Sequence, residues 1–116
     1  MAALHPFFAC YVGDTAEISG TLLYADGTPF NLASGAVVQW TLENAAGAKV
    51  LELSLNAGIT VADETSGTIL ITMTPEQTAA LPPGRYADQL RATDPNGFVS
   101  TQWAGAIEIR PSFFTP

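Results

Sequence analysis

The sequence predicts an all-β protein, an antiparallel sandwich of about seven or eight strands with one short helical turn near residues 75–80. Three observations lead to this prediction. Apolar and polar residues alternate in short runs, as in strands with one buried face. Glycine-rich turns separate the runs at roughly the 8–12 residue spacing of sandwich proteins. No connection is long enough to hold the helix that usually joins parallel neighbours.

The first half of the chain is expected to form strands joined by tight turns. Residues 15–24 alternate and end at an Asp26-Gly27 turn, where glycine accepts a positive φ without strain. Residues 29–32 are expected at an edge, since Pro29 cannot donate to a central ladder. Residues 36–43 follow as a half-buried strand, and a glycine turn ends it at residues 44–47.

The second half continues this pattern and contains the helical signal. Thr74 suits the N-cap, Pro75 the first helical position and Gln77 a capping box, before Pro82 and Pro83 stop the helix. The predicted strands are residues 51–55, 59–61, 68–73, 85–93 and 98–110, the last two joined by a turn at 94–97.

Length and composition indicate one domain over residues 1–116, with residues 1–12 and 111–116 as arms available for assembly. Hydrophobic residues make up 47% and charged residues 13%, which excludes a disordered chain. So few charges suggest that a partner covers part of the surface. We expect neither a secretory signal nor a membrane helix, because no basic start and no apolar run of about 20 residues occur.

The charge restricts the class of partner. Eleven acidic and four basic residues give a net charge of −7. Such a chain repels phosphate backbones and anionic lipid surfaces, so neither nucleic acid nor a membrane is an expected partner.

The sequence offers little for catalysis or metal binding. The single histidine, His5, precedes the first clear strand, and Cys10 is expected to be a small buried residue. A hydrolase would need a base beside its nucleophile, so no catalytic residue is assigned and no enzyme activity is expected. Loop acids such as Asp26 and Asp94 fit turns better than calcium ligation. No metal site and no cofactor are predicted.

Three further residues have a functional and a structural interpretation. Trp40 and Trp103 would form a sugar-binding platform if exposed, but each is in register with apolar neighbours and is expected in the core. Asp88 shares a face with buried positions, which favours a hydrogen-bonded polar group over a general acid.

The chain ends are aromatic, although termini are normally polar. Phe7 and Phe8 precede the predicted sandwich, and Phe113 and Phe114 follow it. Exposed apolar groups of this kind mark protein contacts, so we predict these four residues as assembly contacts.

Tyr86 stands at the start of a late strand, after a leucine and a proline–glycine corner. This placement is typical of the tyrosine corner of immunoglobulin-like sandwiches, in which the hydroxyl bonds to nearby backbone. The Cys–Trp–Cys spacing of antibody domains does not occur here.

The order of the motifs over residues 12–110 resembles that of the small immunoglobulin-like sandwich proteins of tailed bacteriophages, including the N-terminal domains of baseplate upper proteins. Each motif alone is ordinary turn chemistry. The motifs are Gly13-Asp14-Thr15, Asp26-Gly27-Thr28-Pro29, Gly35-Ala36, Gly67-Thr68, Thr74-Pro75-Glu76, Pro83-Gly84 with Tyr86, and Asp94 with Gly97.

The resemblance implies a non-enzymatic virion structural protein, either a capsid-decoration or head-associated subunit or a tail or baseplate subunit. Its partners would be other virion proteins and copies of itself, and its location the virion assembled in the host cytoplasm. Baseplate upper proteins continue into long C-terminal regions, whereas this sequence stops at Pro116. The alternative is an immunoglobulin-like module that binds a carbohydrate or a host surface through loop aromatics.

Overall fold

The computed structural model describes residues 8–113 of the 116-residue chain, and that range contains eight strands and one short helix. The predicted helical turn and most predicted strands are present within a few residues of their expected bounds, but the edge segment expected at residues 29–32 is reduced to an isolated bridge between Leu23 and Pro29. The elements are β1 Phe8–Tyr11, β2 Ala16–Thr21, β3 Val37–Glu43, β4 Lys49–Leu55, β5 Gly58–Asp63, β6 Thr68–Met73, α1 Pro75–Ala79, β7 Gly84–Thr93 and β8 Val99–Arg110.

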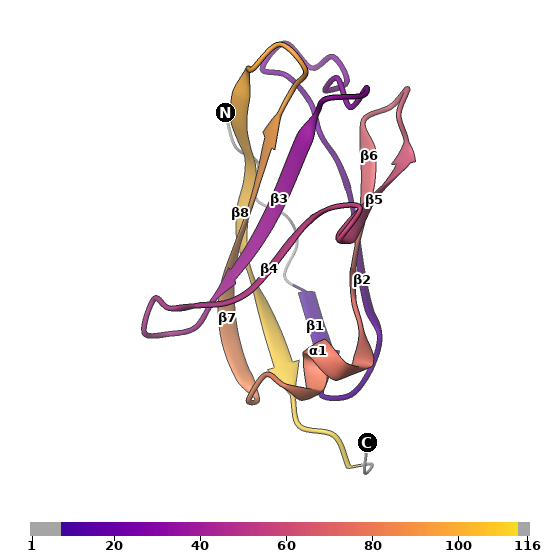
Figure 1. The fold of residues 1–116 in the computed structure, drawn as a ribbon. Coiled ribbons are helices and arrows are strands. Elements are labelled where there is room, and N and C mark those ends of the chain that lie inside the picture. The colour runs from indigo at the N-terminus through magenta and orange to yellow at the C-terminus, as the bar shows by residue number, and fades with distance from the viewer. Residues whose placement is uncertain (1–7, 114–116) are drawn as a thin grey trace.

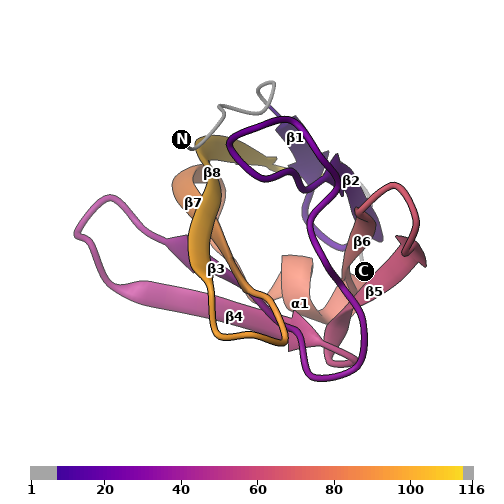
Figure 2. The same cartoon turned by 90° about the horizontal axis from the view of Figure 1, so that it is seen from above.

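The strands form two layers that face each other across the core (Figures 1 and 2). Their hydrogen-bonded order is β1-β8-β7-β3-β4-β5-β6-β2. One layer contains β8, β7 and β3, the other contains β5, β6 and β2, and β4 runs from the first to the second. The predicted all-β, immunoglobulin-like sandwich is therefore confirmed.

Two of the seven neighbouring strand pairs are parallel, although the sequence led us to expect antiparallel neighbours. β4 meets β5 at only two residue pairs, after a bend in which Asn56 and Gly58 take φ values of 68° and 103°. The bend moves the chain from one layer to the other, so no crossover helix is required.

The parallel pairing of β1 with β8 places the described part of the expected N-terminal arm, residues 8–11, in the sheet, and residues 1–7 lie outside the described residues. Phe8 lies opposite Ile107 and Tyr11 opposite Arg110, so residues 8–11 belong to the sheet. Cys10 is buried, as expected, and Phe8 is half-buried against the core. Apolar burial and backbone pairing together hold this segment on the domain.

The core between the layers contains both tryptophans. Trp40 is fully buried and Trp103 is 5% exposed, which confirms the core interpretation over a sugar platform. The Trp103 ring reaches across the core to Gly20 on β2, where a Cβ atom would lie 2.4 Å from ring atom Cζ3. A glycine is required at this position because the indole occupies the space of any side chain.

A bulge in β8 turns two consecutive side chains inward. The register with β7 shifts between Leu90 and Arg91, so both Gln102 and Trp103 are buried. The Gln102 Oε1 atom accepts a hydrogen bond from the Leu23 backbone amide at 3.0 Å. The bulge thereby fixes the chain that leaves β2 against the opposite layer.

α1 has the predicted capping box: the Gln77 amide donates to Thr74 Oγ1, and the Gln77 side chain accepts from the Thr74 amide. Thr78 is fully buried. Its Oγ1 atom accepts from the Gly13 amide at 3.1 Å and donates to the Asp14 carbonyl at 2.8 Å. Within residues 8–113, no helix is long and apolar enough to cross a membrane.

Candidate functional surfaces

The corner before β7 fixes the lower end of the sandwich. The Tyr86 hydroxyl donates a hydrogen bond of 2.5 Å to the Pro82 carbonyl oxygen. The ring is 5% exposed, and its burial raises the pKa of the phenol. Tyr86 thus holds the proline segment in a defined position below the core.

An apolar cleft of about 390 Å³ lies beside this corner. Residues 79–83, Val12, Pro111 and Ser112 line it, so its wall includes the end of α1, the corner and the chain leaving β8. The hydrogen bonds of Thr78 and Tyr86 hold two of these segments in place. Ser112 supplies the one polar side chain among the lining residues.

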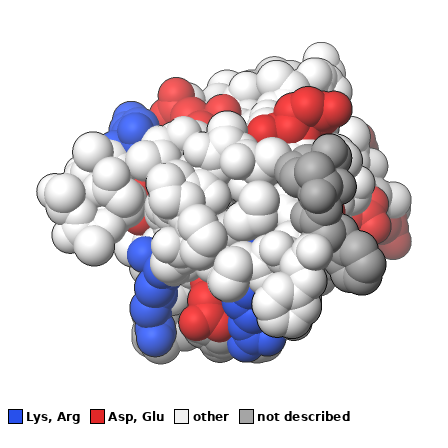
Figure 3. Space-filling model, turned by 90° about the horizontal axis from the view of Figure 1, so that it is seen from below, with Lys and Arg blue, Asp and Glu red and all other residues white. Residues whose placement is uncertain are grey.

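The end of the molecule that carries this cleft has few charges. Figure 3 views the molecule from below and shows a broad area without Lys, Arg, Asp or Glu, with charged side chains at its margins. We call this area the end face. The exposed residues that line the cleft at this end are Ala79, Ala80, Pro82, Pro83 and Pro111, and the exposed Phe113 follows shortly after Pro111 in the sequence.

The structure describes two of the four predicted aromatic contacts, Phe8 and Phe113. Phe7 and Phe114 lie outside the described residues. Phe8 packs partly against the core, which leaves less of its ring for a partner. Phe113 follows the cleft-lining Pro111 and Ser112 and is fully exposed. Among the described aromatic ends, Phe113 therefore presents the larger unburied surface.

The opposite, upper end of the sandwich is held by polar contacts. Asp94 Oδ2 accepts from the Tyr24 hydroxyl at 2.8 Å, and its Oδ1 accepts from the Asn96 and Phe98 amides at 2.9 Å each. The bond from the Phe98 amide, followed by that from Tyr24, lowers the pKa of Asp94. Phe98 lies near Tyr24, with 5.7 Å between ring centroids.

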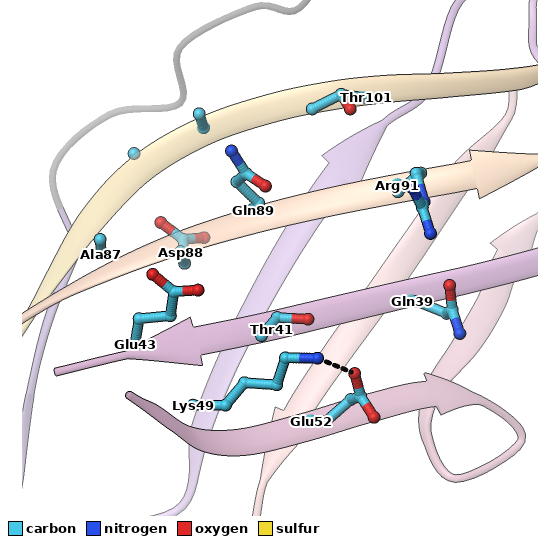
Figure 4. A pocket seen from close by; sticks show the side chains of 12 residues that line it. Gln39, Thr41, Glu43, Lys49, Glu52, Ala87, Asp88, Gln89, Arg91 and Thr101 are labelled. Carbon is cyan, nitrogen blue, oxygen red and sulfur yellow. Dashed lines mark hydrogen bonds and ion pairs between the residues drawn. The ribbon is translucent and has the colours of Figure 1, made fainter. Parts of the chain in front are cut away.

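A third surface is a groove of about 520 Å³ on the outer face of the β8–β7–β3–β4 layer (Figure 4). Gln39 lies opposite Arg91 and Thr41 opposite Gln89, so strand pairing gathers these polar side chains. The other lining residues are Glu43, Lys49, Glu52, Ala87, Asp88, Thr101, Ala104 and Gly105. Sequence reasoning missed this groove because its residues come from four strands.

Asp88 is a buried polar group, as its face on β7 predicted. Its Oδ2 atom accepts hydrogen bonds from both tryptophans, at 2.8 Å from Trp40 Nε1 and at 3.1 Å from Trp103 Nε1. The side chain is 3% exposed. This geometry gives Asp88 a structural role, since one oxygen satisfies two buried indoles.

The remaining candidates for chemistry are separate from one another. Burial, with a smaller contribution from the charge of Asp14, raises the pKa of the Cys10 thiol and disfavours the reactive thiolate. Asp26 and Asp63 each accept bonds from backbone amides two residues ahead, as turn residues do. Within residues 8–113, no three His, Cys, Asp or Glu residues gather as a metal site.

Comparison with known protein families and with curated proteins gives no match. Solved structures share the fold. The N-terminal domain of phage TP901-1 ORF48 has a TM-score of 0.55 and 15% identity, covering 92% of this chain and 85% of that one.

CopC from Methylosinus trichosporium OB3b has a TM-score of 0.50 and 10% identity, covering 94% of this chain and 88% of that one. Fibronectin(III)-like modules of Clostridium thermocellum CbhA have a TM-score of 0.47 and 14% identity, covering 93% of each chain. At these identities the similarity concerns the fold alone.

Proposed function

We propose that this chain is a non-enzymatic structural protein of a bacteriophage virion that works through protein–protein contacts. The observation that supports it most is Phe113, which is fully exposed directly after the cleft-lining residues Pro111 and Ser112. Water penalises such an aromatic surface, and burial against a partner removes the penalty. The fold similarity to a phage domain and the net charge of −7, which disfavours nucleic acid and anionic membranes, agree with this proposal.

The proposed assembly surface is the end face. It offers an apolar centre with charges at its margin, the arrangement found in protein interfaces. The capsid-decoration, head-associated, tail and baseplate roles all require such a surface, and we propose no choice among them.

Incorporation into particles tests this function. Particles purified after lysis of the producing host should contain the chain at a fixed copy number, measured by quantitative mass spectrometry. Phe113→Ser should lower that number several-fold, because it removes exposed apolar surface without touching the core. Val99→Ser is the matched control, since Val99 is 54% exposed on the upper half of β8.

Two results would contradict the proposal. The chain would be absent from purified particles, or Val99→Ser would reduce incorporation as much as Phe113→Ser. The second result would move the contact away from the end face.

A second function, recognition of a saccharide, is favoured by the groove rather than by loop aromatics. Its amide, hydroxyl and guanidinium groups, from Gln39, Thr41, Gln89 and Arg91, suit the hydroxyl groups of a sugar. A glycan array would identify the ligand. Gln89→Ala should then weaken binding about two- to tenfold, the effect of one lost hydrogen bond. Thr60→Ala, an exposed change on β5, is the control. Equal binding of the glycan by the two variants would show that the groove is not the saccharide-binding site.

A further inference from the structure

This end of the molecule has two complementary features, an apolar cleft and an exposed aromatic ring. The apolar cleft of about 390 Å³ is a concave half, and the fully exposed Phe113 ring is a convex half. Pro111 and Ser112 line the cleft, and Phe113 follows them directly. A pocket and an aromatic side chain that fits its chemistry therefore lie side by side on one molecule.

The ring of Phe113 does not fill the cleft of its own chain. Its complete exposure shows that it makes no such contact. Two segments of the cleft wall are held in place, because Tyr86 bonds to Pro82 and Thr78 bonds to Gly13 and Asp14. Binding of a side chain does not have to order these two segments, which lowers its cost.

We propose that Phe113 of one copy inserts into the apolar cleft of a second copy, and that the second copy returns the same contact. This proposal rests on the proposed assembly function and names its contact. A two-fold axis through the end face would place each ring over the other cleft, because an isologous interface uses the same patch twice.

The distribution of charge agrees with a second copy as the occupant. Each copy has a net charge of −7, so association through charged faces would be repulsive. The end face lacks charged side chains at its centre, which lets two copies meet there at lower electrostatic cost. An apolar cleft also has little to offer a charged or strongly polar partner.

Sedimentation equilibrium of the full chain, from about 10 μM to 1 mM, tests the contact, since two small apolar contacts predict a weak dimer. The unchanged chain should form a dimer. Phe113→Ser removes the ring and Ala80→Glu places a charge in the cleft, and each alone should raise the dissociation constant at least tenfold. Unchanged urea midpoints for both variants would show that they remain folded.

Mixing the two variants tests whether the dimer forms by insertion of Phe113 of one copy into the cleft of the other. The Phe113→Ser chain keeps an intact cleft and the Ala80→Glu chain keeps an intact ring, so their mixture restores one of the two contacts. It should associate more tightly than either variant alone. The doubly substituted chain has neither an intact ring nor an intact cleft, so its mixture with either single variant restores no contact and is the control.

The inference is overturned if the unchanged chain stays monomeric at 1 mM. It is also overturned if the variant mixture associates no better than its components. Particle incorporation is an independent measurement. If the chain is monomeric but still enters particles, only the proposed Phe113–cleft contact is rejected. If the chain dimerises but is absent from particles, only the virion function is rejected.

Discussion

The contact between Gly20 and Trp103 shows how a single missing side chain sets the spacing of the two layers. Trp103 projects from the β8 layer and its ring lies against the backbone of β2. The indole also donates to Asp88, so it is held from both sides. Any atom added at position 20 must displace a ring that has little room to move.

We expect Gly20→Ala to lower the free energy of unfolding by about 1–3 kcal/mol, the usual cost of overpacking a core. The added Cβ would lie 2.4 Å from the Trp103 ring. Urea unfolding followed by tryptophan fluorescence measures the loss. Ser19→Ala, at the neighbouring exposed position, should change stability by less than about 0.5 kcal/mol. A Gly20→Ala protein as stable as the unchanged chain would show that the ring can shift at no cost.

At the residue scale, the sequence predicts which side chains are buried better than it predicts their hydrogen-bond partners. Period-two alternation placed Trp40, Trp103 and Asp88 inside, and all three are buried. The sharing of one Asp88 oxygen by two indoles depends on strand pairing and on the β8 bulge. Neither can be read from spacing along the chain.

At the scale of elements, the β7–β8 hairpin and the segment after β2 are joined through one carboxylate. Asp94 accepts from its own turn and from Tyr24, and the Tyr24 hydroxyl also accepts from the Asn31 amide at 3.3 Å. These bonds connect segments far apart in the sequence. They stabilise the charged form of Asp94, which lowers its pKa below the ordinary value of 3.8.

Stability at acid pH should therefore depend on Asp94. Because the folded-state pKa is lowered, the contribution is complete above the unfolded value of 3.8 and is lost as the pH falls through the folded-state pKa. We expect Asp94→Asn to destabilise the protein near pH 7 and to differ less from the unchanged chain at pH values well below 3.8. Urea midpoints across pH 2–7 measure this. Glu64→Gln, in an exposed loop, is the control, and a difference that grows toward acid pH would contradict the assignment.

The elements that sequence reasoning located are those with local signals. The capping box of α1 and the turns at Asp26 and Asp94 need only neighbouring residues, and all three are present. β1 was missed because it has no polar alternation, and its partner, residues 107–110, is almost a full chain length away. A pairing of that separation leaves no mark in either segment alone.

At the scale of the whole molecule, charge and shape divide the surface into distinct parts. The end face has uncharged residues and a cleft, whereas the groove on the β8–β7–β3–β4 layer has polar and charged lining. The low charged fraction of 13% led us to expect a covered surface. The charged fraction alone does not indicate which surface that is, and the cleft could not be predicted from the sequence because residues 79–83 and 111–112 meet only in the folded chain.

The parallel pairing of β1 with β8 also determines how the domain carries mechanical load. The described chain begins at Phe8, opposite Ile107, and passes beyond Arg110 at the other end of the same ladder. A pull on the two ends in opposite directions slides these strands along each other, so the bonds between them share the force. In an antiparallel terminal pair the bonds would open one after another. If the domain is attached to other molecules at both ends, tension between the two attachment points would therefore load β1 and β8 in shear.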